Sequence, residues 1–506
     1  MNSVVKDEHL VLKMRLGSST FKARLLQALE RLGGPYRVLK GPESSSRALL
    51  RTSSSFGRKS AGAGAASGRR LVRTAADDSQ WIYYGREEAY WGGRVQEIVL
   101  GRPTHSLEDW RRRLETAGLK PTPEARTAQT AASTTASYLR RYAVTVFHLR
   151  AWEVRPLGKA GLTLPLLGEA LSPESPLYKR LRNTAVRALY AVGLDFGEVV
   201  ISAGEEGKFT VDSITPISDL GSAATKAIAQ AMRVTLEEQE KLLDSPTERL
   251  IGMDPEFLLF DRAHGKVIPA SRYLHFHGEA GCDVLRYRGQ RLFPLAELRP
   301  RPGKEPRDVV VHLLHAFHEA RASIQDQGLI WQAGAMPQRG FPLGGHLHFS
   351  GVSLTPELLR TLDNYLALPL ALLEDPRSAP RRPKYGFLGD FRIKEYGGFE
   401  YRTLPSFLIS PLVTKGVVAL ARFIIEHADR LKARPLEKEA VWTAFYTGRK
   451  QPLREALPRL IADIHEVPDY TRYQGYIEPL LNAIQSGYVW DESADIRPAW
   501  KLQNPS

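Results

Sequence analysis

The spacing of hydrophobic and polar positions changes several times in the middle of the chain and predicts a succession of elements. An apolar, β-branched run over residues 142–154 predicts strand structure, and helical spacing follows over residues 178–192. Gly193 would end that helix, because glycine readily adopts the left-handed conformation found after a helix C-terminus. The runs GLDFGEVVI and KFTVDSITPIS, within residues 193–218, predict a β-hairpin. An Ala- and Glu-rich stretch over 223–244 predicts one more helix.

Two longer amphipathic patterns appear in the second half of the chain. The first, over residues 306–328, predicts a helix that is closed by Gly328. The second, over residues 355–375, begins with Thr355 followed by Pro356. Threonine is a good N-cap and proline is favoured at the first helical position, so this pattern predicts a capped helix.

Two stretches lack large apolar side chains, and they guide the predicted domain boundaries. Residues 41–76 and 120–137 are rich in Ser, Gly, Ala, Thr and Arg, so they cannot bury enough surface to offset the entropy of ordering. We expect mobile loops or linkers there. The predicted organisation is a basic N-terminal region (1–137), an α+β segment (138–245) and a large C-terminal domain (246–506).

The composition is that of a globular protein. The chain has 506 residues, 43% of them hydrophobic and 25% charged, which excludes a wholly disordered or fibrous protein. The longest uncharged apolar run, residues 365–373, is far shorter than the roughly 20 residues needed to span a bilayer. The N-terminus also lacks the apolar core of a signal peptide. We therefore expect a cytoplasmic protein without a membrane partner.

The positive charge is concentrated near the N-terminus. The formal net charge is +14, and residues 1–150 carry 26 Lys and Arg against 13 Asp and Glu. Such an excess could attract nucleic acid or another polyanion, or it could form a solvated Arg-rich face. The second interpretation is favoured, because no RNA-binding motif or zinc-finger spacing accompanies the charge.

Cysteine content restricts the chemistry of any metal site. Cys282 is the only cysteine, so a disulfide within the chain and a site built from several thiolates are both excluded. A metal ion would have to be held by oxygen and imidazole ligands. The neighbouring Asp283 could contact a substrate or a metal, but a loop acid without a catalytic task is the favoured interpretation.

Four short segments of the C-terminal domain each place two polar residues two positions apart in an apolar or aromatic strand pattern. Side chains alternate along a strand, so each pair faces one side of its sheet. Burying an unpaired carboxylate is costly, so these groups must meet opposite charges, metal ions or water. Pro255 lies between the first two carboxylates and suggests an edge or bulged strand. The pairs are Asp254 and Glu256, Glu297 and Arg299, His346 and His348, and Glu400 and Arg402.

The residue types in these segments indicate phosphate chemistry. Carboxylates and imidazole without thiols suit Mg²⁺ or Mn²⁺, which bind together with water and phosphate oxygens. Arg299, Arg392 and Arg402 could make bidentate contacts to phosphate or carboxylate groups. The combination predicts phosphoryl transfer.

The order of these motifs resembles a known family. G-x-D-P-E-F, A-E-L-R-P, G-G-H-x-H-F and Y-G-G-F-E-Y-R-x-L-P-S follow one another over about 250–411, as in the phage-type carboxylate-amine ligases (amidoligases), relatives of glutamine synthetase and glutamate-cysteine ligase. The resemblance implies a glutamine synthetase-like curved antiparallel sheet with flanking helices. It also implies ATP- and Mg²⁺- or Mn²⁺-dependent amide formation through an acyl phosphate.

The resemblance also implies roles for individual residues. Arg402 would contact phosphate, and Asp254, shorter than the glutamate usual in the family, could reach its metal through water. The implied metal ligands are Asp254, Glu256, Glu297, His346 and Glu400. The implied catalytic residues are Glu256, Arg299, Arg392 and Arg402, and the implied ATP contacts are Arg392, Arg402 and His348.

A second resemblance concerns the segment before the C-terminal domain. The pattern A-x-x-A-L-x-A-x-G-L-D, followed by two strand patterns, is similar to the closing segment of ATP-grasp ligase domains. At the positions of that family's magnesium ligands this chain has Val200, Ser213 and Thr215, which are poor ligands. The expected fold is therefore α+β throughout, with a truncated, non-catalytic ATP-grasp-like α/β region preceding the ligase domain.

The predicted function is a ligase that joins a small-molecule or peptide carboxylate to an amine. One alternative is a metal-dependent hydrolase in which His346 and His348 help to activate water. Another is a non-catalytic, ligase-like module that binds a polyanion such as nucleic acid through the basic N-terminus. The resemblance leaves a homo-oligomer open, because glutamine synthetase relatives often build their sites between subunits.

Overall fold

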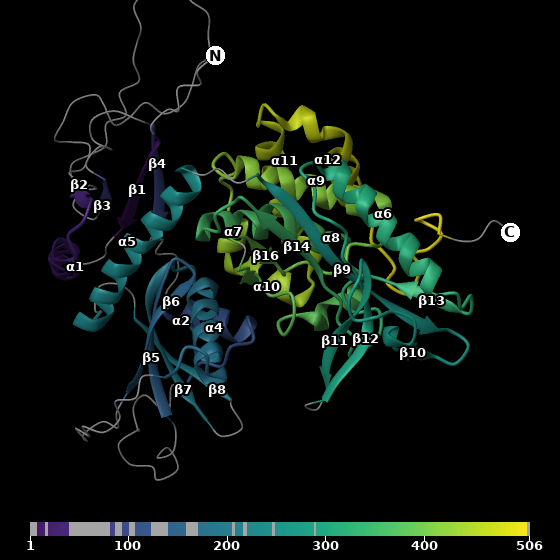
Figure 1. Cartoon of the computed structure of the whole chain (residues 1–506), viewed down its shortest axis with the longest axis horizontal. Helices are drawn as coiled ribbons and strands as arrows, with labels where there is room; N and C mark the ends of the chain where they lie inside the picture. Colours follow the sequence, from purple (N-terminus) through teal and green to yellow (C-terminus); the bar gives the residue numbers. More distant parts are fainter. Residues whose placement is uncertain are drawn as a thin grey trace, which may run out of the picture. The chain divides into compact units, whose positions relative to one another are not determined.

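The structure of the chain is a computed structural model (Figure 1). The described part comprises residues 8–15, 19–39, 81–86, 94–100, 107–122, 140–157, 171–204, 208–215, 220–244, 248–287, 290–395 and 397–502. The predicted loops at 41–76 and, beyond residue 122, at 120–137 lie outside these residues. Contacts divide the chain into unit 1 (1–103, 122–189 and 193–245) and unit 2 (104–121, 190–192 and 246–506). The predicted three-domain division stays a prediction.

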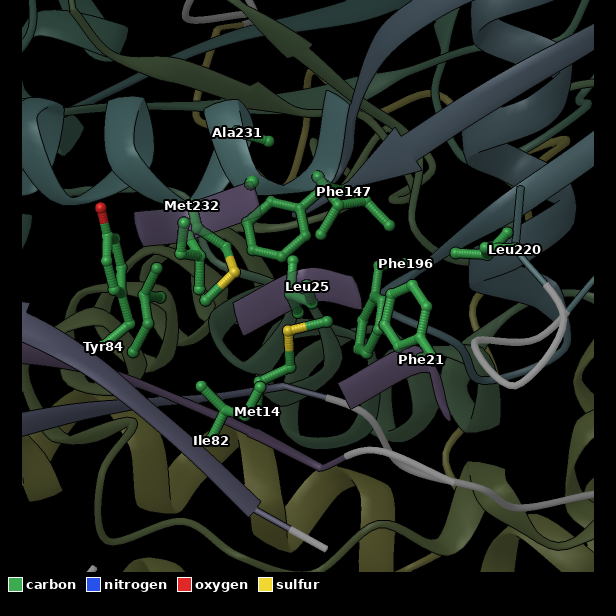
Figure 2. Close-up of a cluster of buried hydrophobic side chains, with 14 of the residues drawn as sticks. Met14, Phe21, Leu25, Ile82, Tyr84, Phe147, Phe196, Leu220, Ala231 and Met232 are labelled. Atoms are coloured by element: carbon green, nitrogen blue, oxygen red, sulfur yellow. The ribbon is translucent and has the colours of Figure 1, made fainter. Parts of the chain in front are cut away.

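Unit 1 contains a four-stranded sheet with the order β2-β3-β1-β4. Strand β1 pairs with β3 antiparallel and with β4 parallel. Helices α1 and α5 pack together, and their apolar side chains join those of the sheet in one core, where Phe21, Leu25 and Met232 lie beside Met14 and Ile82 (Figure 2). The elements are β1 (Glu8–Arg15), α1 (Ser19–Leu32), β2 (Tyr36–Leu39), β3 (Trp81–Arg86), β4 (Arg94–Leu100) and α5 (Ser222–Asp244).

A second sheet of unit 1 is antiparallel throughout, with the order β6-β5-β7-β8. The hairpin predicted within residues 193–218 is confirmed as β7 and β8. The strand pattern at 142–154 is two strands, because His148 and Leu149 adopt φ angles of 53° and 62° and reverse the chain. The elements are β5 (Arg140–Phe147), β6 (Arg150–Leu157), α4 (Pro176–Ala191), β7 (Phe196–Ala203) and β8 (Phe209–Thr215).

Unit 2 is built on an eight-stranded sheet with the order β11-β12-β9-β14-β16-β15, to which β10 and β13 add by pairing with β9. Every pairing in this sheet is antiparallel. The predicted α+β chain with an antiparallel C-terminal sheet and flanking helices is therefore confirmed (Figure 1). The strands are β9 (Leu250–Asp261), β10 (Lys266–Ile268), β11 (Ala280–Tyr287), β12 (Gln290–Leu298), β13 (Leu329–Gln332), β14 (Gly345–Ser350), β15 (Phe391–Ile393) and β16 (Phe399–Tyr401).

The helices of unit 2 confirm two predicted starts, but one predicted helix is interrupted and the other ends earlier than predicted. Thr355 Oγ accepts a hydrogen bond from the Leu358 N–H, as expected of an N-cap. The helix that follows is interrupted by a π-helical turn, Asp363–Ala367, and α6 ends at Ser323, before Gly328. The helices are α2 (Leu107–Thr116), α6 (Pro306–Ser323), α7 (Pro356–Leu362), α8 (Leu368–Leu373), α9 (Pro411–His427), α10 (Glu439–Thr447), α11 (Lys450–His465) and α12 (Tyr470–Gln485), with 3₁₀ turns at Ala270–Arg272, Pro376–Arg381 and Pro435–Glu437.

No helix in the described part of the chain combines the length and the apolar character needed to cross a membrane.

Two helical glycines in unit 2 provide a matched test of the packing between α9 and α12. A Cβ at Gly416 on α9 would lie 2.5 Å from Leu480 Cβ, whereas a Cβ at Gly475 on α12 would meet no atom within 4 Å. We expect Gly416→Ala to destabilise the fold by about 1–3 kcal/mol through overpacking. We expect Gly475→Ala to be neutral or stabilising by up to about 1 kcal/mol, because alanine favours helices. Denaturant unfolding of both variants measures the difference, and equal effects would contradict the packing.

The hairpin between β5 and β6 predicts a pH effect on stability. The Nε2 atom of His148 is buried without a hydrogen-bond partner in the described structure, and this burial lowers the pKa of His148 to about 4, although Asp195 opposes the shift. The ordinary value is near 6.5, so the folded chain binds this proton less readily than the unfolded chain. The neutral, buried His148 therefore costs no stability above about pH 6.5. As the pH falls from there toward 4, the unfolded chain binds the proton more readily and the free energy of unfolding decreases.

The control for this pH effect is His148→Asn, because asparagine tolerates a positive φ and does not titrate. Melting temperatures measured between pH 7 and pH 4 should fall more steeply for the unsubstituted chain than for the variant. Parallel curves would show that His148 does not carry the effect.

Candidate active site

The four predicted pairs lie on neighbouring strands of the unit 2 sheet. Glu297 on β12 lies opposite Glu256 on β9, and Asp254 on β9 lies opposite His346 on β14. His348 lies in turn opposite Glu400 on β16. Directly opposite residues of antiparallel strands project to the same face. The structure therefore gathers the predicted acids and imidazoles on one face of the sheet.

The predicted edge strand at Pro255 is wrong for β9 as a whole, which lies between β12 and β14, although Pro255 itself is paired only with β14. The Glu256 N–H donates to Gly344 O on the β14 side. Backbone N–H groups of successive residues point to opposite sides of a strand, so an N–H at position 255 would point toward β12. The register between β9 and β12 stops at Glu256 opposite Glu297. Proline is tolerated there because its missing N–H falls just beyond the end of that ladder.

Three acids form one group on β9, β11 and β12. Glu256, Asp283 and Glu297 place ligand oxygens within 4.8 Å of one another. Burial raises the pKa of Glu256 well above its ordinary value, and Glu297 and Asp283 add to the rise, although the Gly344 N–H, which donates to Glu256 Oε2 at 2.6 Å, opposes it. Burial also raises the pKa of Glu297 to about 8, with Asp254 and Asp283 adding to the rise. Negative charge is thus crowded here, as expected of a cation site.

The structure places Asp283 differently from the favoured interpretation of the sequence, and agrees with the alternative of a metal contact. It was expected in a loop without a catalytic task, but it lies on β11 within the acidic group. The signal was present in the pattern AGCDVLRY, where a single acid interrupts an otherwise strand-like run. The adjacent Cys282 is buried.

A second group contains Asp254, His348 and Glu400, whose ligand atoms also lie within 4.8 Å of one another. His348 Nε2 lies 3.0 Å from Asp254 Oδ2, and His346 Nδ1 lies 3.1 Å from Asp254 Oδ1. Burial would raise the pKa of Asp254, but the two imidazoles outweigh it and hold that pKa below its ordinary value. The sequence assigned the metal-binding imidazole to His346, whereas this group contains His348.

Cationic side chains surround Glu400, which is 1% exposed. Lys394 Nζ lies 2.5 Å and Arg392 Nη1 3.3 Å from its Oε2, and Arg402 Nη1 lies 3.0 Å from its Oε1. Burial would raise the pKa of Glu400, but His346, Lys394 and Arg402 outweigh this and lower it. Arg392 and Arg402 therefore lie beside Glu400, and their roles as phosphate contacts stay a prediction. Lys394, two positions after Arg392, was missed.

Arg299 differs from the other predicted phosphate contacts. Its guanidinium pairs with Glu297 and donates to the carbonyls of Phe276 at 3.0 Å and Cys282 at 3.4 Å. A Cβ at Gly281 would lie 2.1 Å from Arg299 Nη1, so only glycine leaves room for this side chain. In this arrangement Arg299 holds β11 and the preceding segment against β12.

The Gly344–Gly345 pair allows β14 to begin in a crowded place. A Cβ at Gly345 would lie 2.3 Å from Pro405 O, and its N–H donates to Leu404 O at 3.1 Å. Buried Arg381 donates to the carbonyls of Thr403 and Leu404, and so supports the same chain segment from behind. This support places Gly344 N–H on the Glu256 carboxylate.

The π-helical turn lies behind β16. Asp363, at the start of this turn, accepts a hydrogen bond of 2.6 Å from the Tyr401 hydroxyl, next to Glu400 in the chain. Burial raises the pKa of Asp363 to about 7. The turn therefore fixes the strand that carries Glu400 and leads to Arg402.

Both groups fit divalent cations that prefer hard ligands. One offers three carboxylates and the other two carboxylates and an imidazole, a donor set that suits Mg²⁺ or Mn²⁺. Arg392, Lys394 and Arg402 beside them could bind an anion such as phosphate. Cations and phosphate together are the requirements of phosphoryl transfer.

Comparison with known proteins agrees with the motif resemblance. A protein-family model described as phage phiEco32-like COOH.NH2 ligase-type 2 matches residues 251–502. No match was found among curated proteins.

Solved structures give remote similarities. A bifunctional glutathione synthetase from Pasteurella multocida is 13% identical over 52% of this chain and 49% of its own, with a TM-score of 0.31. The ligase PafA, in its complex with the prokaryotic ubiquitin-like protein Pup, is 11% identical over 49% and 65%, with a TM-score of 0.31. Glutamine synthetase from Plasmodium falciparum is 12% identical over 61% and 76%, with a TM-score of 0.24. The chain thus spans less than two thirds of the first two.

The family match covers the eight-stranded sheet and all four predicted motifs. Residues 251–502 are therefore identified as a region of the phage phiEco32-like COOH.NH2 ligase-type 2 family.

Proposed function

We propose that the chain is an ATP-dependent ligase that forms an amide from a carboxylate and an amine, with its active site on the face of the unit 2 sheet that carries the two acidic groups. The family match supports this proposal. The observation that carries it is the meeting of two cation-binding groups with a cluster of Arg and Lys side chains on one sheet face.

The two groups would divide the binding of divalent cations between them. Glu256, Asp283 and Glu297 would hold one ion, and Asp254, His348 and Glu400 would hold another. Bound Mg²⁺ or Mn²⁺ would neutralise charge on the phosphate oxygens of ATP. The remaining tasks fall to the side chains of the protein.

The proposed reaction has two steps. A carboxylate oxygen of the first substrate bonds to the γ-phosphorus of ATP, and the bond from that phosphorus to the bridging oxygen breaks, releasing ADP. The amine of the second substrate then attacks the acyl carbon and loses a proton to water, and phosphate leaves with the electron pair of the carbon–oxygen bond. Arg392 and Arg402 bind the phosphoryl oxygens and hold the group in line with the attacking carboxylate.

Small molecules or peptides are the proposed carboxylate and amine substrates, and no nucleophilic side chain is required. The alternative hydrolase would use His346 and His348. Both imidazoles contact Asp254, and this group lies beside the Arg and Lys side chains that suit phosphate binding, which favours the ligase. The polyanion-binding alternative concerns the N-terminal region, much of which lies outside the described residues.

A metal-binding measurement tests the inclusion of Asp283. Asp283→Asn removes one negative oxygen ligand from the acidic group, so we expect Mn²⁺ to bind about 10- to 100-fold more weakly. Isothermal titration calorimetry of the full chain with Mn²⁺ alone measures the affinity. Asp429→Asn, at an exposed position after α9, is the matched control and should bind Mn²⁺ like the unsubstituted chain. Equal binding by both variants would remove Asp283 from the site.

A condensation assay tests the proposed activity. The full chain is incubated with ATP, Mg²⁺ and a pool of amino acids and peptides, and mass spectrometry searches for products lighter by one water than their summed components. We expect ADP and phosphate release, and we expect Glu256→Gln and Glu400→Gln each to reduce it by at least about 100-fold. Glu466→Gln, at an exposed position, should be fully active.

Several outcomes would contradict the proposal. Full activity of both Glu256→Gln and Glu400→Gln would show that the reaction does not take place on this face of the sheet. Zinc-dependent turnover without ATP would favour the hydrolase. Salt-sensitive nucleic-acid binding without nucleotide hydrolysis would favour the binding module.

A further inference from the structure

Cationic side chains gather around Glu400 at the hairpin formed by β15 and β16. Among the residues that the structure describes, Arg392, Lys394 and Arg402 all lie within 3.5 Å of Glu400, and Asp390 lies 3.9 Å from Arg402. Three carboxylates, Glu400, Asp390 and Asp254, lie close to these three cations. A divalent cation bound to the carboxylates would leave the Arg and Lys side chains available to an incoming anion.

Lys394 has the shortest of these contacts with Glu400. Its Nζ lies 2.5 Å from Oε2, and its side chain is 21% exposed, compared with 57% for Arg392. It therefore reaches into the sheet face while keeping access to a ligand there. The sequence places it two residues after Arg392, so both side chains project to the face on which Glu400 lies.

The backbone around Lys394 is held firmly by the hairpin turn. The Lys394 N–H donates to Gly398 O at 2.9 Å, and the Gly397 N–H donates to Lys394 O at 3.2 Å. Gly397 adopts a φ of 83°, a conformation that favours glycine. The turn thus fixes the Cα position, while the four-carbon side chain leaves the ammonium group free to move between nearby oxygens.

We propose that Lys394 is a further catalytic residue that contacts the transferred phosphoryl group. This inference rests on the proposed ligase function and adds a residue to it. In the ground state the ammonium group lies on Glu400. When nucleotide and carboxylate are bound, it contacts a non-bridging oxygen of the γ-phosphoryl group.

The role of Lys394 in the step is electrostatic. The bond between the substrate carboxylate oxygen and the γ-phosphorus forms as the bond to the bridging oxygen breaks, and the electron pair of the broken bond leaves on ADP. Lys394 stays protonated throughout and neither gives nor accepts a proton. Its contact with the phosphoryl oxygens strengthens as charge redistributes in the transition state, so its effect should appear mainly in kcat.

A purely structural role makes different predictions. If Lys394 only neutralised Glu400, its loss would lower the melting temperature, and a small amine in solution would not restore turnover. A catalytic ammonium can be replaced in part by methylammonium when the side chain is shortened. The same rescue does not repair a misfolded hairpin.

The experiment compares Lys394→Ala and Lys394→Arg with the control Lys432→Ala, whose side chain is exposed elsewhere in unit 2. Initial rates of ADP release are measured for the full chain with Mg²⁺, ATP and the substrates found in the condensation assay. We expect kcat to fall about 100-fold or more for Lys394→Ala, with a smaller change in the KM for ATP. Lys394→Arg should recover part of kcat, methylammonium should raise the rate of Lys394→Ala, and Lys432→Ala should be unchanged.

The outcomes separate this inference from the proposed function. Turnover by the unsubstituted chain with an undiminished kcat in Lys394→Ala would overturn the role of Lys394 and leave the ligase intact. Loss of kcat without rescue by methylammonium or by arginine, together with a lowered melting temperature, would also overturn it in favour of a structural role. Absence of turnover by the unsubstituted chain would overturn the ligase proposal itself.

Discussion

The burial of several carboxylates on one face of an antiparallel sheet is the constraint on which the rest of unit 2 depends. Glu256, Glu297 and Glu400 are each less than a tenth exposed, and an uncompensated carboxylate in such a place is strongly unfavourable. The protein compensates them unequally. Glu400 is surrounded by three cationic side chains, whereas Glu256 and Glu297 have raised pKa values although Arg299 pairs with Glu297. The face therefore has an acidic part around Glu256 and a second part, around Glu400, where cationic side chains gather.

The pairing of strand β9 determines how these carboxylates are arranged. This strand is the central one, and β12 and β14 pair with its two sides over successive stretches. The position of Pro255 marks the change from one partner to the other. Because the register is antiparallel, each carboxylate of β9 meets a functional residue of a neighbouring strand, Glu256 with Glu297 and Asp254 with His346. A shift of the β9 register by one residue would turn its carboxylates to the opposite face of the sheet.

Much of this site could be predicted from the sequence, because alternation along a strand is a local rule. It placed Asp254 with Glu256 and His346 with His348 correctly, before any pairing of strands was known. The same rule pointed to Lys394 beside Arg392, but lysine near a turn is usually solvent-exposed, and only the register with Glu400 distinguishes it. Asp283 required knowledge of which strand pairs with β12, which a local pattern does not contain. The break at His148 and the early end of α6 likewise depend on tertiary packing that overrides hydrophobic periodicity.

The π-helical turn at Asp363–Ala367 carries a consequence for how this sheet face could change in evolution. Such a turn accommodates roughly one extra residue compared with an α-helix. Removing one residue would restore regular winding, and a deletion that takes Asp363 itself would leave the Tyr401 hydroxyl without this acceptor. A single deletion in a buried helix could therefore inactivate a homologue whose ligands and cations are all intact, so motif searches alone would misclassify it as functional.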